Sequence, residues 1–106
     1  VCEIGTWAFD GCANLTSVIM PESVETIGAY AFNECVKLPT IQLPLNIRSI
    51  GNSAFYGCKE LDNIVIPDFV AEIEDSVFCR CEGLKTIKLH DSIERIGSYA
   101  FFKLGG

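Results

Sequence analysis

The chain has 106 residues, of which 49% are hydrophobic and 21% are charged, a composition typical of one globular domain rather than of a disordered segment. Its 8 basic and 14 acidic residues give a formal net charge of −6, which opposes contact with a phosphate backbone and argues against nucleic acid as a partner. No apolar run reaches the roughly 18 residues of a membrane span, so no insertion into a membrane is expected.

A period of 23 residues runs through the chain and defines one repeat array. Its copies are residues 4–26, 27–49, 50–72 and 73–95, followed by a partial copy, residues 96–106. Apolar columns recur at fixed offsets, among them Ile4, Ile27, Ile50, Ile73 and Ile96, and also Phe9, Phe32, Phe55, Phe78 and Phe101. A fixed period of this length is the signature of a solenoid, in which stacked units share one core.

The first half of each copy is written in the second copy as "IGAYAFNEC", residues 27–35. Its apolar residues Ile27, Ala31, Phe32 and Cys35 follow at offsets of four, five and eight, which is one face of a helix. This spacing predicts a short helical turn in every copy.

The second half follows as "LPTIQLP", residues 38–44. Apolar residues alternate here, and Pro44 cannot continue a ladder of hydrogen bonds, so the pattern predicts a short strand. A second extended piece, residues 46–50, leads into the next copy. Such a unit is too small to bury its own apolar side, and stacking with strands about 4.7–4.9 Å apart supplies the core.

Six cysteines in a short chain usually suggest a disulfide framework. Four of them share one column, Cys12, Cys35, Cys58 and Cys81, so we expect free thiols packed as small hydrophobic side chains. Cys2 and Cys79 lie outside this column, at positions expected to be exposed and reactive. A closed zinc site needs four ligands, and no second cysteine pair accompanies Cys79 and Cys81, so no metal is expected.

The stretch "IGNSAFYGCKELDNIVIPDFVAEI", residues 50–73, resembles the BspA-like class of leucine-rich repeats, and the resemblance covers essentially the whole chain. It implies an α/β repeat solenoid: a right-handed horseshoe of about four and a half 23-residue coils, with short strands on one face and short helical turns on the other. The departures from the pattern are Glu74 for glycine, Val77 for alanine, His90 for proline and Leu104 for cysteine. Three of them fall in the fourth copy, where turn geometry is expected to vary.

Catalytic groups are sparse. The one histidine, His90, lies in a turn column otherwise held by proline, and we expect it to face solvent, without the nucleophile and orienting group that a base needs. Glu72, Glu74 and Asp75 predict a solvated acidic surface, with a loosely held cation as the alternative. No phosphate-binding or triad motif is present, so neither an enzyme nor a cofactor is expected.

Non-repeating positions of the strand half are the candidates for function. They alternate with the inward residues and change from copy to copy, which suits a protein or glycan partner, although single exposed apolar residues are also ordinary. The candidate strand-face residues are Thr16, Ile19, Gln42, Asp62, Val65, Lys85 and Lys88. Trp7 and Tyr30 share another column, one copy apart, and form either an aromatic platform or a packed cover of the first coil.

The resemblance implies an extracellular or cell-surface adhesion module that binds a host protein, a matrix protein or a glycan. The alternative is a structural spacer that carries another domain of a larger surface protein. Val1 and Gly106 both interrupt a copy, and solenoids normally end in capping repeats. We therefore expect a fragment of a longer array, whose uncovered edges promote end-to-end self-association.

Overall fold

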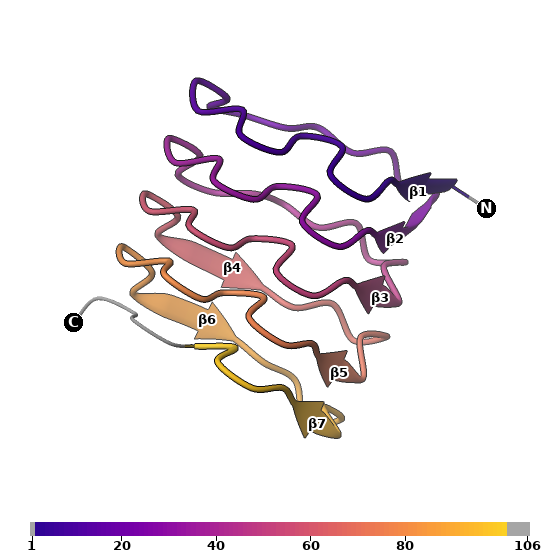
Figure 1. Ribbon diagram of the computed structural model, residues 1–106. Coiled ribbons are helices and arrows are strands. Elements are labelled where there is room, and N and C mark those ends of the chain that lie inside the picture. The colour runs from indigo at the N-terminus through magenta and orange to yellow at the C-terminus, as the bar shows by residue number, and fades with distance from the viewer. Residues whose placement is uncertain (1, 102–106) are drawn as a thin grey trace.

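The computed structural model describes residues 2–101, and they form a stack of coils with one coil for each repeat (Figure 1). We number the coils in chain order: coil 1 is residues 4–26, coil 2 is 27–49, coil 3 is 50–72, coil 4 is 73–95 and coil 5 is 96–101. The expectations for the chain ends, which concern Val1, Leu104 and Gly106, lie outside the described residues. Within residues 2–101 no helix is long and apolar enough to cross a membrane.

Short parallel strands join the coils at two places. The first place, which we call the corner, holds β1 (Cys2–Ile4), β2 (Val24–Ile27) and β3 (Ser49–Ile50) in one sheet, and β5 (Glu72–Ile73) with β7 (Arg95–Ile96) in another. The second place, which we call the strand face, holds β4 (Asn63–Val65) paired with β6 (Thr86–Lys88). Partners lie 23 residues apart, as Ile27 and Ile50 do, which is the period of the sequence; the exception is Cys2 with Val24, where the register shifts by one residue.

The strand predicted in the second half of each copy, residues 38–44 in the second, is wrong for coils 1 and 2. Only Thr40 makes a β-bridge there, with Asn63 of coil 3, whereas the equivalent residues of coils 3 and 4 form β4 and β6. The residues of coil 2 have the right alternation but lack a paired neighbour along most of their length. The second extended piece, residues 46–50, does end in a strand, β3.

The predicted helical turns are also wrong, because no helix forms among the described residues. The side of the stack that carries residues 5–13 and their equivalents, which we call the turn face, is built from successive tight turns. Trp7, Tyr30, Ser53, Ser76 and Tyr99 have φ between 57° and 63°, in the left-handed region that ends a right-handed helix.

Backbone hydrogen bonds on the turn face alternate between two kinds of acceptor. The amide of Ala8 donates to Gly5 within the turn over 3.1 Å, whereas the amide of Phe9 donates to Ala31 of the next coil over 2.7 Å. A helix would direct every amide back along its own chain. The turn face instead links the coils, with apolar residues inward at a spacing similar to that of a helix.

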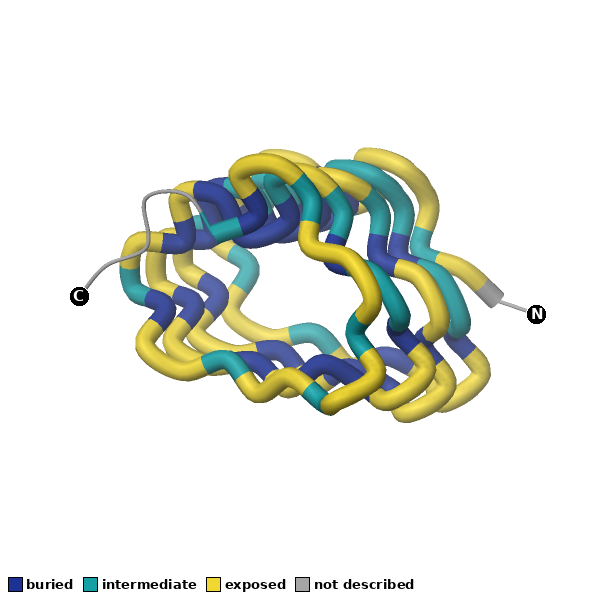
Figure 2. Tube along the Cα trace, turned by 90° about the horizontal axis from the view of Figure 1, so that it is seen from below, coloured by how far each residue is buried: buried dark blue, intermediate teal, exposed yellow. Residues whose placement is uncertain are grey.

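The core is a ladder of phenylalanine rings that runs along the stack. Phe32, Phe55 and Phe78 are fully buried, and successive rings from Phe9 to Phe101 stack with centroids 5.2 to 5.8 Å apart. Buried positions recur at equivalent places in the coils of the middle of the stack (Figure 2), whereas Ala100 alone is buried among residues 96–101. Each ring packs on the equivalent ring of the neighbouring coil, so no coil has a complete core of its own.

The cysteine column is a second ladder beside the rings. Cys35, Cys58 and Cys81 are free and fully buried, and Cys12 is free and half-buried. The prediction of packed free thiols is confirmed for this column.

The expectation that Cys79 is exposed is wrong, because it is a free thiol with 5% of its surface accessible. The adjacent Arg80 donates from Nε to the hydroxyl of Tyr56, 3.1 Å away, and Tyr56 precedes Cys79 in its column. The backbone of Cys79 is also joined to coil 3, because the amide of Gly57 donates to its carbonyl oxygen over 2.9 Å. The side chain of Cys2 lies outside what the structure describes.

Candidate functional site

The strand face presents the predicted binding residues to solvent. Their inward neighbours Ile41 and Ile64 are 4% and 1% exposed, because successive residues of an extended chain point to opposite sides. Ile19 and Val65 are 96% and 59% exposed. The exposed candidates are Thr16, Ile19, Gln42, Asp62, Val65, Lys85 and Lys88.

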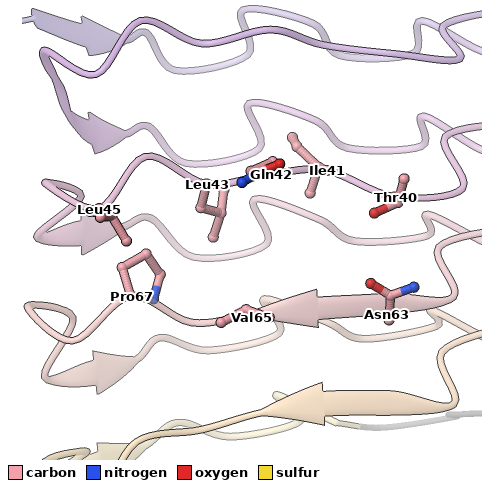
Figure 3. A pocket seen from close by; sticks show the side chains of 8 residues that line it. All are labelled: Thr40, Ile41, Gln42, Leu43, Leu45, Asn63, Val65 and Pro67. Atoms are coloured by element: carbon pink, nitrogen blue, oxygen red, sulfur yellow. The ribbon is translucent and has the colours of Figure 1, made fainter.

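A groove of about 360 Å³ opens between coils 2 and 3 on this face (Figure 3). We call it the coil 2–3 groove. Apolar surface comes from Leu45, Val65 and Pro67, and Leu45 is 74% exposed. Its full lining is Thr40, Ile41, Gln42, Leu43, Leu45, Asn63, Val65 and Pro67. The groove is thus bordered by exposed apolar side chains and by neutral polar groups.

This groove exists because coils 2 and 3 separate after a single point of pairing. Thr40 bridges Asn63, and the amide of Asp62 donates to Pro39 over 2.9 Å. Coils 3 and 4 instead stay paired through the whole of β4 and β6, and the amide of Ile66 donates to Lys88 over 3.0 Å. The side of β4 that faces coil 2 is therefore bridged only at Asn63, and the two chains diverge beyond that point.

A second groove, of about 270 Å³, lies between coils 1 and 2. We call it the coil 1–2 groove, and its lining is Val18, Ile19, Met20, Glu22, Gln42 and Pro44. Gln42 lines both grooves. Of the predicted residues, the structure thus brings Ile19, Gln42 and Val65 to one grooved surface.

The remaining predicted residues border that surface without lining either groove. Lys85 and Lys88 lie on coil 4, and the amide of Lys85 donates to the carbonyl oxygen of Asp62 over 2.9 Å. Thr16 lies at the start of the strand half of coil 1. The predicted residues on coils 1 and 2 are therefore uncharged, Asp62 on coil 3 is acidic, and the two on coil 4 are basic.

Leu45 is a groove residue that the alternation of the strand half does not indicate. It follows Pro44 and lies in a turn, outside the alternating segment. A signal was available, because the equivalent positions of the other coils hold Glu22, Asp68 and Asp91. A leucine in an otherwise acidic, exposed column is the kind of outlier that marks a contact surface.

The two aromatic candidates lie together on the turn face. The rings of Trp7 and Tyr30 stack with centroids 4.1 Å apart and planes 6° from parallel. Trp7 is 50% exposed and Tyr30 is half-buried. The pair covers the turn face of coil 1, away from the strand face and its grooves.

His90 does not simply face solvent as expected, because it is half-buried and uses both ring nitrogens. Nδ1 accepts from the amide of Ser92 over 3.1 Å, and Nε2 lies 2.8 Å from the carbonyl oxygen of Val70. With Nδ1 accepting, Nε2 carries the proton and donates it. The ring therefore ties coil 4 to coil 3 and has no nitrogen free to act as a base.

The acidic cluster is partly structural as well. Oδ1 of Asp75 accepts from the amide of Ser98 over 2.8 Å, and Glu72 and Glu74 are half-buried. Within residues 2–101 no group of three or more histidine, cysteine, aspartate or glutamate side chains could hold a metal ion. The strand face therefore remains the strongest candidate site.

Comparison with known proteins places this geometry among leucine-rich repeats. The family model described as BspA type leucine-rich repeat region (6 copies) matches residues 1–105. A leucine-rich repeat protein of T. pallidum is similar in structure, with a TM-score of 0.85, 31% identity and coverage of 90% of this chain. No curated protein matches the chain significantly.

Two further solved structures are similar. One is a leucine-rich repeat protein from Bacteroides ovatus, with a TM-score of 0.79, 27% identity and 95% of this chain covered. The other is a leucine rich cell surface protein from Faecalibacterium prausnitzii, with a TM-score of 0.61, 27% identity and 97% covered. This chain spans 44%, 26% and 40% of the T. pallidum, B. ovatus and F. prausnitzii chains.

Proposed function

This chain belongs to the BspA type leucine-rich repeat family, and we propose that its strand face is a non-catalytic surface for binding a macromolecule. The observation that carries the proposal is the exposure of Ile19, Leu45 and Val65, at 96%, 74% and 59%, along two adjoining grooves. A partner that covers these side chains removes their apolar surface from water, which favours binding by about 25 cal/mol per Å².

The chemistry of the grooves favours a protein partner over a glycan. Their apolar borders are aliphatic side chains, Leu45, Val65 and Pro67 among them, rather than the aromatic rings on which sugars stack. The aromatic pair Trp7 and Tyr30 lies on the other face. A host or matrix protein with exposed apolar side chains is therefore the expected ligand.

We place the protein outside the cell or at its surface. The support is family membership together with the structural neighbour from F. prausnitzii, which is named a cell surface protein. Because this chain spans less than half of each similar protein, longer arrays would present more coils to the same partner. Affinity then grows by multivalency without new kinds of contact.

The test is a binding screen of the chain, displayed in many copies, against extracellular-matrix proteins and glycans. The variant Val65→Asp/Lys88→Glu alters the strand face. Its matched control, Ile96→Asp/Arg95→Glu, makes the same charge change on the corner, where Ile96 is 53% exposed. The proposal predicts a ligand that the first variant loses and the control retains.

Other outcomes contradict the proposal. Binding that both variants retain would place the contact elsewhere on the molecule, and binding only to glycans would exclude the protein partner. No binding by any folded form would favour the structural spacer that carries another domain.

A further inference from the structure

The corner is hydrogen-bonded at every junction of the described coils except one. The amides of Gly28, Gly51 and Gly97 donate to the isoleucine that opens the preceding coil, over 2.7, 2.7 and 2.6 Å. The equivalent residue at the junction of coils 3 and 4 is Glu74, and among the described residues no such bond joins it to Ile50. In Figure 1 the sheet that contains β3 stops here and pairing resumes between β5 and β7.

A second backbone hydrogen bond of the corner is missing at the same junction. The amide of Arg48 donates to Glu25 over 2.8 Å, and that of Glu94 donates to Ala71 over 2.7 Å. Within residues 2–101 no bond links Ala71 to Arg48 in the same way. A space of about 230 Å³ lies there, lined by Arg48, Ser49, Ile50, Ala71, Glu72 and Glu74.

The glycines explain why the other junctions close. A Cβ atom on Gly28 would lie 2.5 Å from the backbone nitrogen of Thr6, and one on Gly97 would lie 2.6 Å from that of Asp75. Such approaches require a backbone to move, since carbon and nitrogen in van der Waals contact lie well over 3 Å apart. Glu74 has a Cβ atom at this position, so coil 4 cannot approach coil 3 as closely at the corner.

The strand face shows the opposite pattern. Coils 3 and 4, open at the corner, are paired through β4 and β6. Coils 1, 2 and 3, paired at the corner, are separated by the two grooves. The turn face is hydrogen-bonded at both of these junctions. Between coils 2 and 3 the amide of Phe32 donates to Ala54 over 2.8 Å, and between coils 3 and 4 that of Phe55 donates to Val77 over 3.0 Å.

We propose that Glu74 is a wedge that tilts coil 4 against coil 3, and that this tilt closes the strand face at that junction. Each coil is a tightly packed loop around a continuous core, so coils that separate at one edge approach at the other. The residue of the glycine column thereby decides where the strand face carries a groove. This last consequence for binding rests on the proposed function, whereas the tilt itself does not.

The experiment measures amide hydrogen exchange by NMR in the free protein and in three variants at one position. Glu74→Gly removes the wedge, Glu74→Ala keeps the Cβ atom, and Glu74→Gln keeps the side-chain bulk but removes its charge. In Glu74→Gly we expect the amides of Ala71 and of position 74 to gain about tenfold protection. The amides of Thr86 and Ile66, which donate to Asp62 and Lys88 on the strand face, should lose protection by a similar factor.

The alanine and glutamine variants should exchange like the natural protein. Equal corner protection in the glycine and alanine variants would overturn the wedge, because then the Cβ atom is not the obstacle. Gain of corner protection in Glu74→Gln would overturn the wedge as well, because the charge of Glu74 rather than its bulk would then keep the coils apart. Corner protection without loss at Ile66 and Thr86 would overturn the coupling between the two edges. No ligand is involved, so these results stand apart from those of the binding screen.

Discussion

The Sγ atom of Cys58 donates a hydrogen bond to the backbone carbonyl oxygen of Phe32, 3.2 Å away in the preceding coil. The link repeats from Cys35 to Phe9 over 3.2 Å and from Cys81 to Phe55 over 3.0 Å. Each of these carbonyl groups also accepts a backbone amide of its own turn, as Phe32 does from Cys35 over 3.2 Å, so the thiol is a second donor. These bonds connect the coils at the side of the phenylalanine ladder.

The first prediction concerns thiol reactivity. The thiolate is the nucleophile, and burial raises the pKa of Cys35 to about 11 and that of Cys81 to about 12. We expect a thiol reagent near neutral pH to leave Cys35, Cys58 and Cys81 unmodified in the native protein, as mass spectrometry of labelled peptides would report. The same reagent in urea should modify all of them. Native labelling of Cys58 at its unfolded rate would contradict the ladder.

Stability should also fall in alkali. Burial, the largest cause, raises the pKa of Cys81 from 9.0 to about 12, so the folded protein keeps this proton at a pH where the unfolded chain has lost it. Where the native state binds more protons, the free energy of unfolding decreases as pH rises. We expect a decrease that begins near pH 9 and continues toward pH 12, measured by urea unfolding. Cys81→Ala should flatten that slope, and an unchanged slope would contradict the assignment.

Loss of a central ring should be severe. Phe55 is fully buried and stacks on Phe32 and Phe78, so Phe55→Ala should lower the free energy of unfolding by about 3–5 kcal/mol. The control is Phe69→Ala, because Phe69 is 54% exposed and its ring lies under the guanidinium of Arg48, 4.7 Å from the ring centroid. That change should cost about 1 kcal/mol. Equal losses in chemical denaturation would refute the ring ladder as the main source of stability.

Two glycines of one column should respond differently to alanine. A Cβ atom at Gly28 meets the backbone of coil 1, whereas one at Gly5 meets nothing within 4 Å. Gly28→Ala should therefore cost about 1–3 kcal/mol of stability, and Gly5→Ala should stay within about 0.5 kcal/mol. Thermal or urea unfolding compares them directly, and a harmless Gly28→Ala would show that the corner has room for a side chain.

Much of the fold could be predicted from the repeat alone. The phenylalanine and cysteine columns indicated which residues meet across coils, since a fixed period gives one register. The helical turns were predicted wrongly because Trp7 and Tyr30 are not residues that usually mark a left-handed backbone. Gly11 and Gly57, which share a second left-handed column with Glu34 and Arg80, were the available signal.

The candidate site could be predicted only in part. Alternation alone indicated that residues such as Ile19 and Val65 face solvent. The grooves depend on how closely neighbouring coils approach, which is decided at the corner by contacts such as Gly28 with Thr6. Burial of Cys79 likewise depends on neighbours from another coil. A column of equivalent residues does not show how closely neighbouring coils approach or which side chains then meet.

The most direct measurement of the central claim is an NMR map of the amide shifts that change when the ligand found by the screen is added. A partner on the strand face should perturb residues 16–19, 40–45 and 63–67, with the largest changes beside the coil 2–3 groove. The turn face around Trp7 and Tyr30 should remain unchanged. Perturbations centred on that aromatic pair, with none along the grooves, would contradict the strand face as the binding surface.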